Sequence, residues 1–96
     1  MSIFSLNGKT ALITGGASGI GKAIAQKFAA QGAEVHILEF NAENGQKVVE
    51  EIVNGGGKAQ FHTCDVSDQK QVQKIVAEIA KKSQINILVN NAGIAH

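Results

Sequence analysis

The residues with the clearest chemical signature form a glycine-rich run between a short apolar segment and an amphipathic one. The run begins at position 14 and reads TGGASGIG. Gly15 allows a tight turn, Gly19 exposes its backbone to a ligand, and Gly21 lets a following helix pack close to a sheet. Amide groups around Ser18 to Ile20 fall at a helix start, where unpaired N–H groups and the helix dipole favour an anion. The run therefore predicts a turn that binds the pyrophosphate of a dinucleotide.

Two alternatives remain open for this turn at the level of the residues alone. Its spacing is G-x-x-x-G-x-G, which differs from the G-x-G-x-x-G fingerprint, and a glycine-rich turn can also be purely structural. Gly16 to Lys22 fit the start of a P-loop, G-x-x-x-x-G-K. A P-loop continues with Ser or Thr, whose hydroxyl holds Mg²⁺, whereas Ala23 follows here. Ala23 therefore argues against a nucleoside triphosphatase.

The other residue types that carry chemistry exclude several classes of function. The nine lysines are scattered, arginine is absent, and the net charge is +1, so nucleic acid is not expected as a partner. The single Cys64 cannot form an internal disulfide, and we interpret it as a small core residue in a reducing compartment. The histidines lie too far apart in the sequence for a metal-ligand motif, and we interpret His36 and His62 as surface or packed strand residues.

The apolar stretches bear on the location of the protein. None approaches the ~20 residues needed to cross a bilayer, and the N-terminus has no basic region followed by an apolar core. We therefore expect a cytoplasmic protein without a membrane partner.

The glycine run must be positioned by regular elements, and the sequence alternates between two periodicities. Short apolar segments predict strands over residues 9–14, 34–39, 58–65 and 85–90. Between them lie three helical patterns: one from Ile20 to a stop at Gly32, one capped by Asn41, and one capped by Ser67 or Asp68. Their apolar stripes are predicted to face the core: Ile20, Ile24, Ala25, Phe28 and Ala29; Val48, Val49, Ile52 and Val53; Val72, Ile75, Val76 and Ile79. The alternation predicts a single α/β domain, a Rossmann-like doubly wound parallel sheet of about four strands and three helices.

The fourth predicted strand suggests that this sheet is incomplete. Residues 87–89 are an unbroken apolar run, ILV, which is typical of a strand buried on both faces and paired on both sides. In the doubly wound order 3-2-1-4 this strand lies at the sheet edge unless another strand pairs with it. We therefore expect further strands from outside these 96 residues.

Three motifs in sequence order resemble those of the short-chain dehydrogenase/reductase family. The first is TGxxxGIG at 14–21, the second is Asp65-Val66 after the third strand, and the third is NNAG at 90–93 after the fourth. Together they cover essentially the whole chain. The resemblance implies that residues 1–96 are the N-terminal part of a longer NAD(P)-binding Rossmann domain.

The resemblance also implies roles for individual residues. Asp65 accepts a hydrogen bond from the adenine amino group, although the residues alone also allow a helix cap or a first-turn acid at this position. The Val66 amide contacts the adenine ring, and Asn90 ties neighbouring strands together. The pyrophosphate and the adjoining ribose are lined by Gly15, Ser18, Gly19 and Ile20. The segment beside the ribose consists of Asn91, Ala92 and Gly93.

Glu39 determines which nicotinamide cofactor is expected. It lies 18 residues beyond Gly21, at the end of the second strand, where an acid accepts hydrogen bonds from the adenosine ribose hydroxyls. A 2′-phosphate about 4 Å away meets a repulsion of roughly 4 kcal/mol per unit charge at an effective dielectric of about 20, before screening. Arginine is absent, and Ser18 stands where NADP-preferring relatives often carry a basic residue. The sequence therefore predicts NAD, with a solvated Glu at a strand end as the alternative.

The family's catalytic motif is missing from this chain. Relatives use Tyr-x-x-x-Lys, and the sequence contains no tyrosine, so we assign no catalytic residue and expect the 96-residue chain to be inactive alone. The resemblance implies an NAD-dependent oxidoreductase that interconverts a small-molecule alcohol and a carbonyl by hydride transfer, as a homodimer or homotetramer. The alternative is a non-catalytic dinucleotide-binding or sensor protein on the same scaffold.

Overall fold

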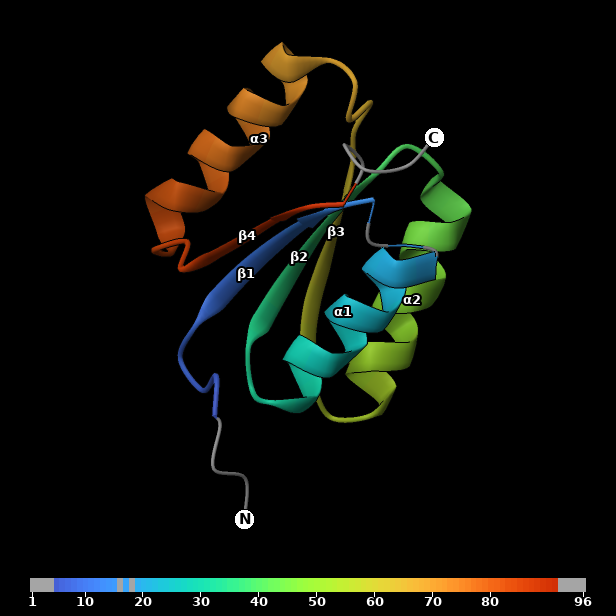
Figure 1. The fold of residues 1–96 in the computed structure, drawn as a ribbon, viewed down its shortest axis with the longest axis vertical. Coiled ribbons are helices and arrows are strands. Elements are labelled where there is room, and N and C mark those ends of the chain that lie inside the picture. The colour runs from blue at the N-terminus through green and yellow to red at the C-terminus, as the bar shows by residue number, and fades with distance from the viewer. Residues whose placement is uncertain (1–4, 16, 18, 92–96) are drawn as a thin grey trace.

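Strands and helices alternate along the whole described chain, as the sequence predicts (Figure 1). The computed structural model describes residues 5–15, 17 and 19–91. The elements are β1 (Thr10–Thr14), α1 (Gly19–Ala30), β2 (Glu34–Glu39), α2 (Ala42–Asn54), β3 (Lys58–Thr63), α3 (Gln69–Lys82) and β4 (Ile87–Asn90).

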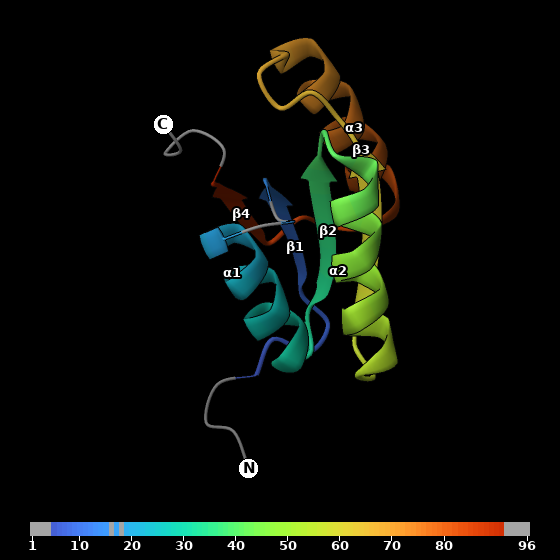
Figure 2. The ribbon, with the colours of Figure 1, turned by 90° about the vertical axis from the view of Figure 1, so that its right-hand side faces the viewer.

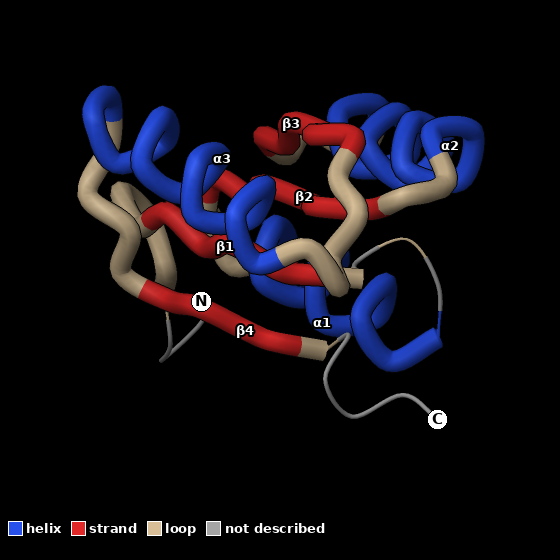
Figure 3. Tube along the Cα trace, turned by 90° about the horizontal axis from the view of Figure 1, so that it is seen from above, coloured by secondary structure: helices blue, strands red, loops and turns tan. Residues whose placement is uncertain are grey.

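The four strands form one parallel sheet in the order β3-β2-β1-β4 (Figure 3). This confirms the predicted Rossmann-like topology. Thr14, the last residue of β1, pairs with Leu38 on one side and with Asn90 on the other, and Glu39 pairs with Thr63. The carboxyl ends of all four strands therefore meet at one edge, which is where a doubly wound sheet binds its ligand.

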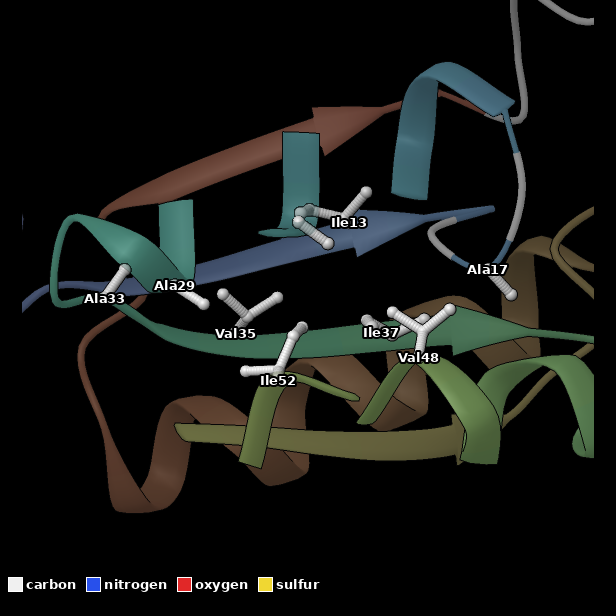
Figure 4. Packing of buried hydrophobic residues seen from close by; sticks show 9 residues of the cluster. Ile13, Ala17, Ala29, Ala33, Val35, Ile37, Val48 and Ile52 are labelled. Atoms are coloured by element: carbon white, nitrogen blue, oxygen red, sulfur yellow. The ribbon is translucent and has the colours of Figure 1, made fainter. Parts of the chain in front are cut away.

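The helices cover both faces of the sheet. In Figure 2, α1 and α2 lie in front of the sheet and α3 lies behind it. The α1/α2 face buries an aliphatic cluster around Ile13, Val35 and Ile37, which packs against small or β-branched helix residues (Figure 4). The α3 face buries a smaller cluster: Leu12, Leu38, Cys64 and Ile79.

Helix α1 approaches the sheet closely because its buried positions are small. Gly21, Ala25 and Ala29 recur every four residues and face the sheet, while Ile24 and Phe28 pack at the margin of the cluster. The prediction that Ile20 begins this buried stripe is wrong, since its side chain is 65% exposed. Ile20 lies in the first turn, at the carboxyl edge of the sheet. After Ala30 the helix ends in a Schellman motif, in which Ala33 N–H donates to Phe28 O (3.1 Å), Gly32 N–H donates to Ala29 O (3.0 Å), and Gly32 has φ 101°.

Side-chain caps begin the other two helices. Asn41 accepts a hydrogen bond from the Asn44 amide, and Asp68, rather than Ser67, caps α3 by accepting from the amides of Lys70 and Gln71. In α2, Val48 and Ile52 are buried, but Val53 is half exposed, so its predicted core position is wrong. Val53 follows Ile52 by about 100° around the helix, which turns it away from the sheet.

Three strands are shorter than the sequence predicts. β1 begins at Thr10 rather than at residue 9. β3 ends at Thr63 rather than at residue 65, although Cys64 N–H still donates to Glu39 O (3.0 Å). β4 begins at Ile87 rather than at residue 85, because the Asn86 side chain takes the place of a ladder carbonyl and accepts from Thr10 N–H (2.9 Å).

Strand β4 pairs only with β1 among the described residues, so it lies at the edge of the sheet. Leu88 in its middle is 64% exposed. The double-sided burial expected for residues 87–89 is therefore not present within this part of the chain, whereas the predicted edge position is confirmed. No helix among the residues described is long and apolar enough to cross a membrane.

Candidate functional site

The turn after β1 contains two glycines in the left-handed backbone region. Gly15 has φ 66°, and its N–H donates to Leu38 O at 2.8 Å, which joins the start of the turn to the end of β2. Gly19, the first residue of α1, has φ 56°. An L-residue in this region is disfavoured by roughly 1–2 kcal/mol, so glycine suits both positions.

Gly21 brings α1 into contact with this turn. A Cβ atom at position 21 would overlap the carbonyl oxygen of Gly15 and lie 2.7 Å from Asn91 Nδ2. That amide nitrogen donates to the same Gly15 oxygen at 3.1 Å. Gly21, Gly15 and Asn91 therefore form one tightly packed group that links α1, the turn after β1 and the residue after β4.

The N-terminus of α1 differs from those of α2 and α3. Its first turn contains no acidic residue, whereas Asn41 and Asp68 cap the other two helices with their own side-chain oxygens. No described atom lies within 4 Å of the place where a Cβ of Gly19 would stand. Among the described residues, nothing outside the local backbone therefore fills the space beside Gly19, next to the first amides of α1, which suits a phosphate held by backbone N–H groups.

Thr14 and Asn90 connect the ends of β1 and β4. Thr14 Oγ1 donates to Asn90 Oδ1 at 3.0 Å. This confirms that Asn90 ties neighbouring strands. Sequence reasoning gave Thr14 no role of its own, although its place as the last strand residue before the glycine turn is visible in the sequence.

Asp65 lies in a tight turn between β3 and α3. Its Oδ1 accepts hydrogen bonds from Ser67 N–H (3.0 Å) and Ser67 Oγ (2.6 Å), and these bonds lower the pKa of the carboxyl group. Both bonds end on Oδ1 and leave Oδ2 for another donor. Because Asp68 is the cap of α3, the alternative of Asp65 as that cap is excluded. The sequence suggests Ser67 only as a possible helix cap. In the structure it instead donates two hydrogen bonds to the Asp65 carboxylate.

Val66 is partly buried and packs against the Leu12, Leu38, Cys64 and Ile79 cluster. It also lines a groove beside the carboxyl edge, together with Thr14, Val72, Val76, Leu88 and Asn90. This groove lies between α3 and β4 and reaches Thr14 at the carboxyl end of β1.

Glu39 occupies the end of β2, between the ends of β1 and β3. Its Oε2 accepts from Asn41 N–H at 3.2 Å, while Oε1 is left for another donor. The side chain is half-buried, and its carboxylate is turned toward the carboxyl edge, where α2 begins. This is the edge to which Gly15 and Asp65 also belong.

The remaining residues considered in the sequence analysis are Cys64, the possible metal ligands, and three residues of the predicted nucleotide site. Cys64 is 1% exposed, and burial raises the pKa of its thiol, so it is a core residue as predicted. Within residues 5–15, 17 and 19–91, no group of three or more His, Cys, Asp or Glu side chains could hold a metal ion. Ser18, Ala92 and Gly93 lie outside the described residues.

Comparison with known proteins gives a consistent answer. The short chain dehydrogenase family model matches residues 9–96. Short-chain dehydrogenase reductase 3a from Arabidopsis thaliana is 42% identical over 95 residues, which cover 98% of this chain and 36% of that protein. The chain therefore spans about a third of the length of the curated relatives that it matches.

Solved structures of dehydrogenases and oxidoreductases also superimpose on this chain. A citronellol catabolism dehydrogenase from Pseudomonas aeruginosa PAO1 superimposes with a TM-score of 0.86 at 37% identity, over 99% of this chain and 44% of that one. A metagenomic short-chain oxidoreductase in complex with NADP gives 0.84 at 34% identity, over 88% and 39%. The family-model match and these relatives, together with the glycine turn and the sheet order, show that the chain belongs to the short-chain dehydrogenase family.

Proposed function

We propose that the intact protein is an NAD-dependent oxidoreductase that interconverts an alcohol and a carbonyl, and that this chain supplies its nucleotide-binding half. The observation that carries the proposal is the arrangement at the carboxyl edge. There the glycine turn follows β1, Glu39 ends β2, and Asp65 lies two residues after the end of β3. The crevice outside the carboxyl ends of such strands is where this type of sheet binds dinucleotides.

The pyrophosphate binds at the start of α1 in this proposal. The amides of Gly19 and Ile20 and the positive end of the helix dipole favour an anion, and the space beside Gly19 admits one. Ser18 completes this group of ligands. Gly21 contributes indirectly, since only glycine lets α1 stand against the Gly15 carbonyl oxygen and so fixes the direction of the amides.

The adenosine binds between the ends of β2 and β3. Asp65 Oδ2 accepts from the adenine amino group, because Ser67 already occupies Oδ1 and holds the carboxylate in place. The Val66 amide contacts the ring edge, and Asn91, Ala92 and Gly93 run beside the second ribose.

Glu39 selects NAD over NADP. One relative's structure contains NADP, so family membership alone does not choose between the two cofactors. Glu39 Oε1 can accept from the adenosine ribose hydroxyls, whereas a 2′-phosphate at that place meets a carboxylate. The sequence offers no arginine to neutralise such a phosphate.

The redox chemistry requires groups from beyond this chain. NAD, when bound, supplies the hydride acceptor at its nicotinamide. The residues described here bind and orient the nucleotide, and they include no tyrosine to act as the acid–base group. We therefore propose that residues 1–96 are the N-terminal part of a longer cytoplasmic domain, that they are inactive alone, and that the intact protein is a homodimer or homotetramer.

The test is the cofactor preference of a Glu39→Ala variant of the intact protein. Calorimetric Kd values for NAD and NADP should approach each other by at least about tenfold, or 1.4 kcal/mol, because the repulsion of the 2′-phosphate is removed. Glu43→Ala is the matched control, since it removes an exposed acid in the first turn of α2. An NAD/NADP affinity ratio that changes equally in both variants, or in neither, would refute the role of Glu39.

A further inference from the structure

A chain of polar side chains crosses the α3 face of the sheet. His36 is 4% exposed, and its Nε2 lies 2.8 Å from Glu34 Oε2. Its Nδ1 lies 3.0 Å from His62 Nε2 on the neighbouring strand β3. The two rings stack with centroids 5.3 Å apart. We call these three residues, Glu34, His36 and His62, the histidine unit.

We propose that the histidine unit is a pH-sensitive contact between β2 and β3. It accommodates at most one extra proton, and a second proton separates β3 and the C-terminal part of α3 from β2. The proposal concerns the α3 face and does not depend on the nucleotide site.

The proton positions follow from the hydrogen bonds. The Glu34 carboxylate only accepts, so His36 Nε2 must carry a hydrogen and donate. In the neutral unit His36 Nδ1 is then a bare acceptor, and His62 Nε2–H donates to it. When His36 carries one extra proton, His62 takes its other tautomer, with the hydrogen on Nδ1, and His36 Nδ1–H donates to the bare His62 Nε2. Both arrangements keep every contact.

A second proton cannot be accommodated while this hydrogen bond is kept. With both rings charged, His36 Nδ1–H and His62 Nε2–H point at each other across 3.0 Å, where neither can accept. The hydrogen bond is lost, and two like charges remain side by side, one on the buried His36 and one on the partly buried His62. Because β3 ends the described sheet, moving it away from β2 is the available relief.

The charges around the unit do not cancel this repulsion. A hollow between β2, β3 and the end of α3 is lined by the unit together with Gln60, Glu78, Ile79, Lys82 and Ser83. Lys58 is the register partner of Glu34. Burial lowers the pKa of His62, the neighbouring His36 lowers it further, and Glu78 opposes both effects. Glu34, Glu78, Lys58 and Lys82 are thus the charged groups around the unit, and burial together with His36 outweighs the opposing effect of Glu78 on His62.

The direction of the pH effect follows. The pKa of His62 in the folded protein lies below its ordinary value of 6.5, so the opened state binds more protons as the pH falls below 6.5. The contribution of neutral His62 to the stability of the closed state is complete above pH 6.5. It is lost as the pH falls through the pKa of His62 in the folded protein. Each unit of separation between the two pKa values changes the opening equilibrium about tenfold.

Hydrogen exchange of the intact protein, followed by mass spectrometry, tests this directly. Imidazole C2–H exchange reports the pKa of His62, and amide exchange reports opening of β3 and of α3. We expect His62 to titrate below an ordinary histidine. We also expect amides of 58–63 and 78–83 to exchange faster at about pH 5.5 than at about pH 7.5, after correction for intrinsic rates, while those of β1 stay protected.

The variant His62→Gln separates titration from packing, because its amide nitrogen can still donate to His36 Nδ1 but cannot be protonated. It should abolish the acid-dependent exchange. Glu34→Gln provides a second variant that keeps an acceptor for His36, and Glu43→Gln, on the other face, is its matched control. Glu34→Gln should shift the pH at which β3 opens, and the control should not. Acid-dependent exchange that persists in His62→Gln, or an ordinary His62 titration, would overturn the proposal.

Discussion

The two faces of the sheet are built differently, although both are covered by helices of the same chain. On the α1/α2 face the buried side chains are aliphatic, and small residues bring α1 against the sheet. On the α3 face the buried cluster is smaller, a hydrogen-bonded histidine pair crosses it, and Leu88 remains 64% exposed. On the first face α1 packs directly against the glycine turn, whereas the second face contains the histidine unit.

The largest expected effect compares the two hydrophobic clusters. Ile37→Ala, on the α1/α2 face, removes a fully buried side chain and should lower the free energy of unfolding by about 4 kcal/mol. Ile79→Ala, in the smaller cluster, should cost about 2 kcal/mol, because the end of α3 can relax into the hollow beside it. Urea unfolding of the intact protein measures both. A greater loss at Ile79 would contradict the ranking of the two faces.

A second prediction concerns the contact between α1 and the glycine turn. Gly21→Ala should lower the free energy of unfolding by about 2 kcal/mol and weaken NAD binding, because its Cβ overlaps the Gly15 carbonyl oxygen. Gly56→Ala is the control: Gly56 has φ 93° and no atom within 4 Å of the added Cβ, so only backbone strain of about 1 kcal/mol is expected. Thermal unfolding and calorimetry report the two effects. Equal loss of NAD affinity in both variants would contradict the role of this contact.

The helix caps should not distinguish the two faces. Asn41→Ala removes the acceptor for one backbone amide and Asp68→Ala the acceptor for two, and each should cost about 1 kcal/mol in unfolding free energy. Chemical denaturation of the two variants is sufficient. A large difference between them would mean that cap strength, rather than packing, separates the faces.

The smallest effect is expected at Asp65. Hydrogen bonds from Ser67 lower the pKa of this carboxyl group, so it stabilises the fold above its ordinary value of 3.8 and loses that contribution as the pH falls. Ser67→Ala should raise the pKa of Asp65 and make the unfolding midpoint slightly less dependent on pH in the acid range. An unchanged pH profile would show that the bond from the Ser67 hydroxyl does not affect the pKa of Asp65, since Ser67→Ala keeps the bond from the backbone N–H.

Sequence reasoning predicted the order of the elements and the edge where the site lies, because periodicity and glycine placement are local signals. It did not predict which flank of a helix turns outward, so Ile20 and Val53 were placed in the core although both are exposed. The contact between His36 and His62 depends on strand register, since Leu38 pairs with His62 and His36 lies diagonally across. No spacing in the sequence reveals that contact. The Ser67–Asp65 bonds likewise depend on the local turn after β3.

A crystal structure of the intact protein with NAD would test the central claim most directly. We expect the pyrophosphate oxygens within about 3 Å of the Gly19 and Ile20 amides, and the adenosine ribose hydroxyls at the same distance from Glu39. A nucleotide seated away from the start of α1, or a ribose that does not contact Glu39, would contradict the account.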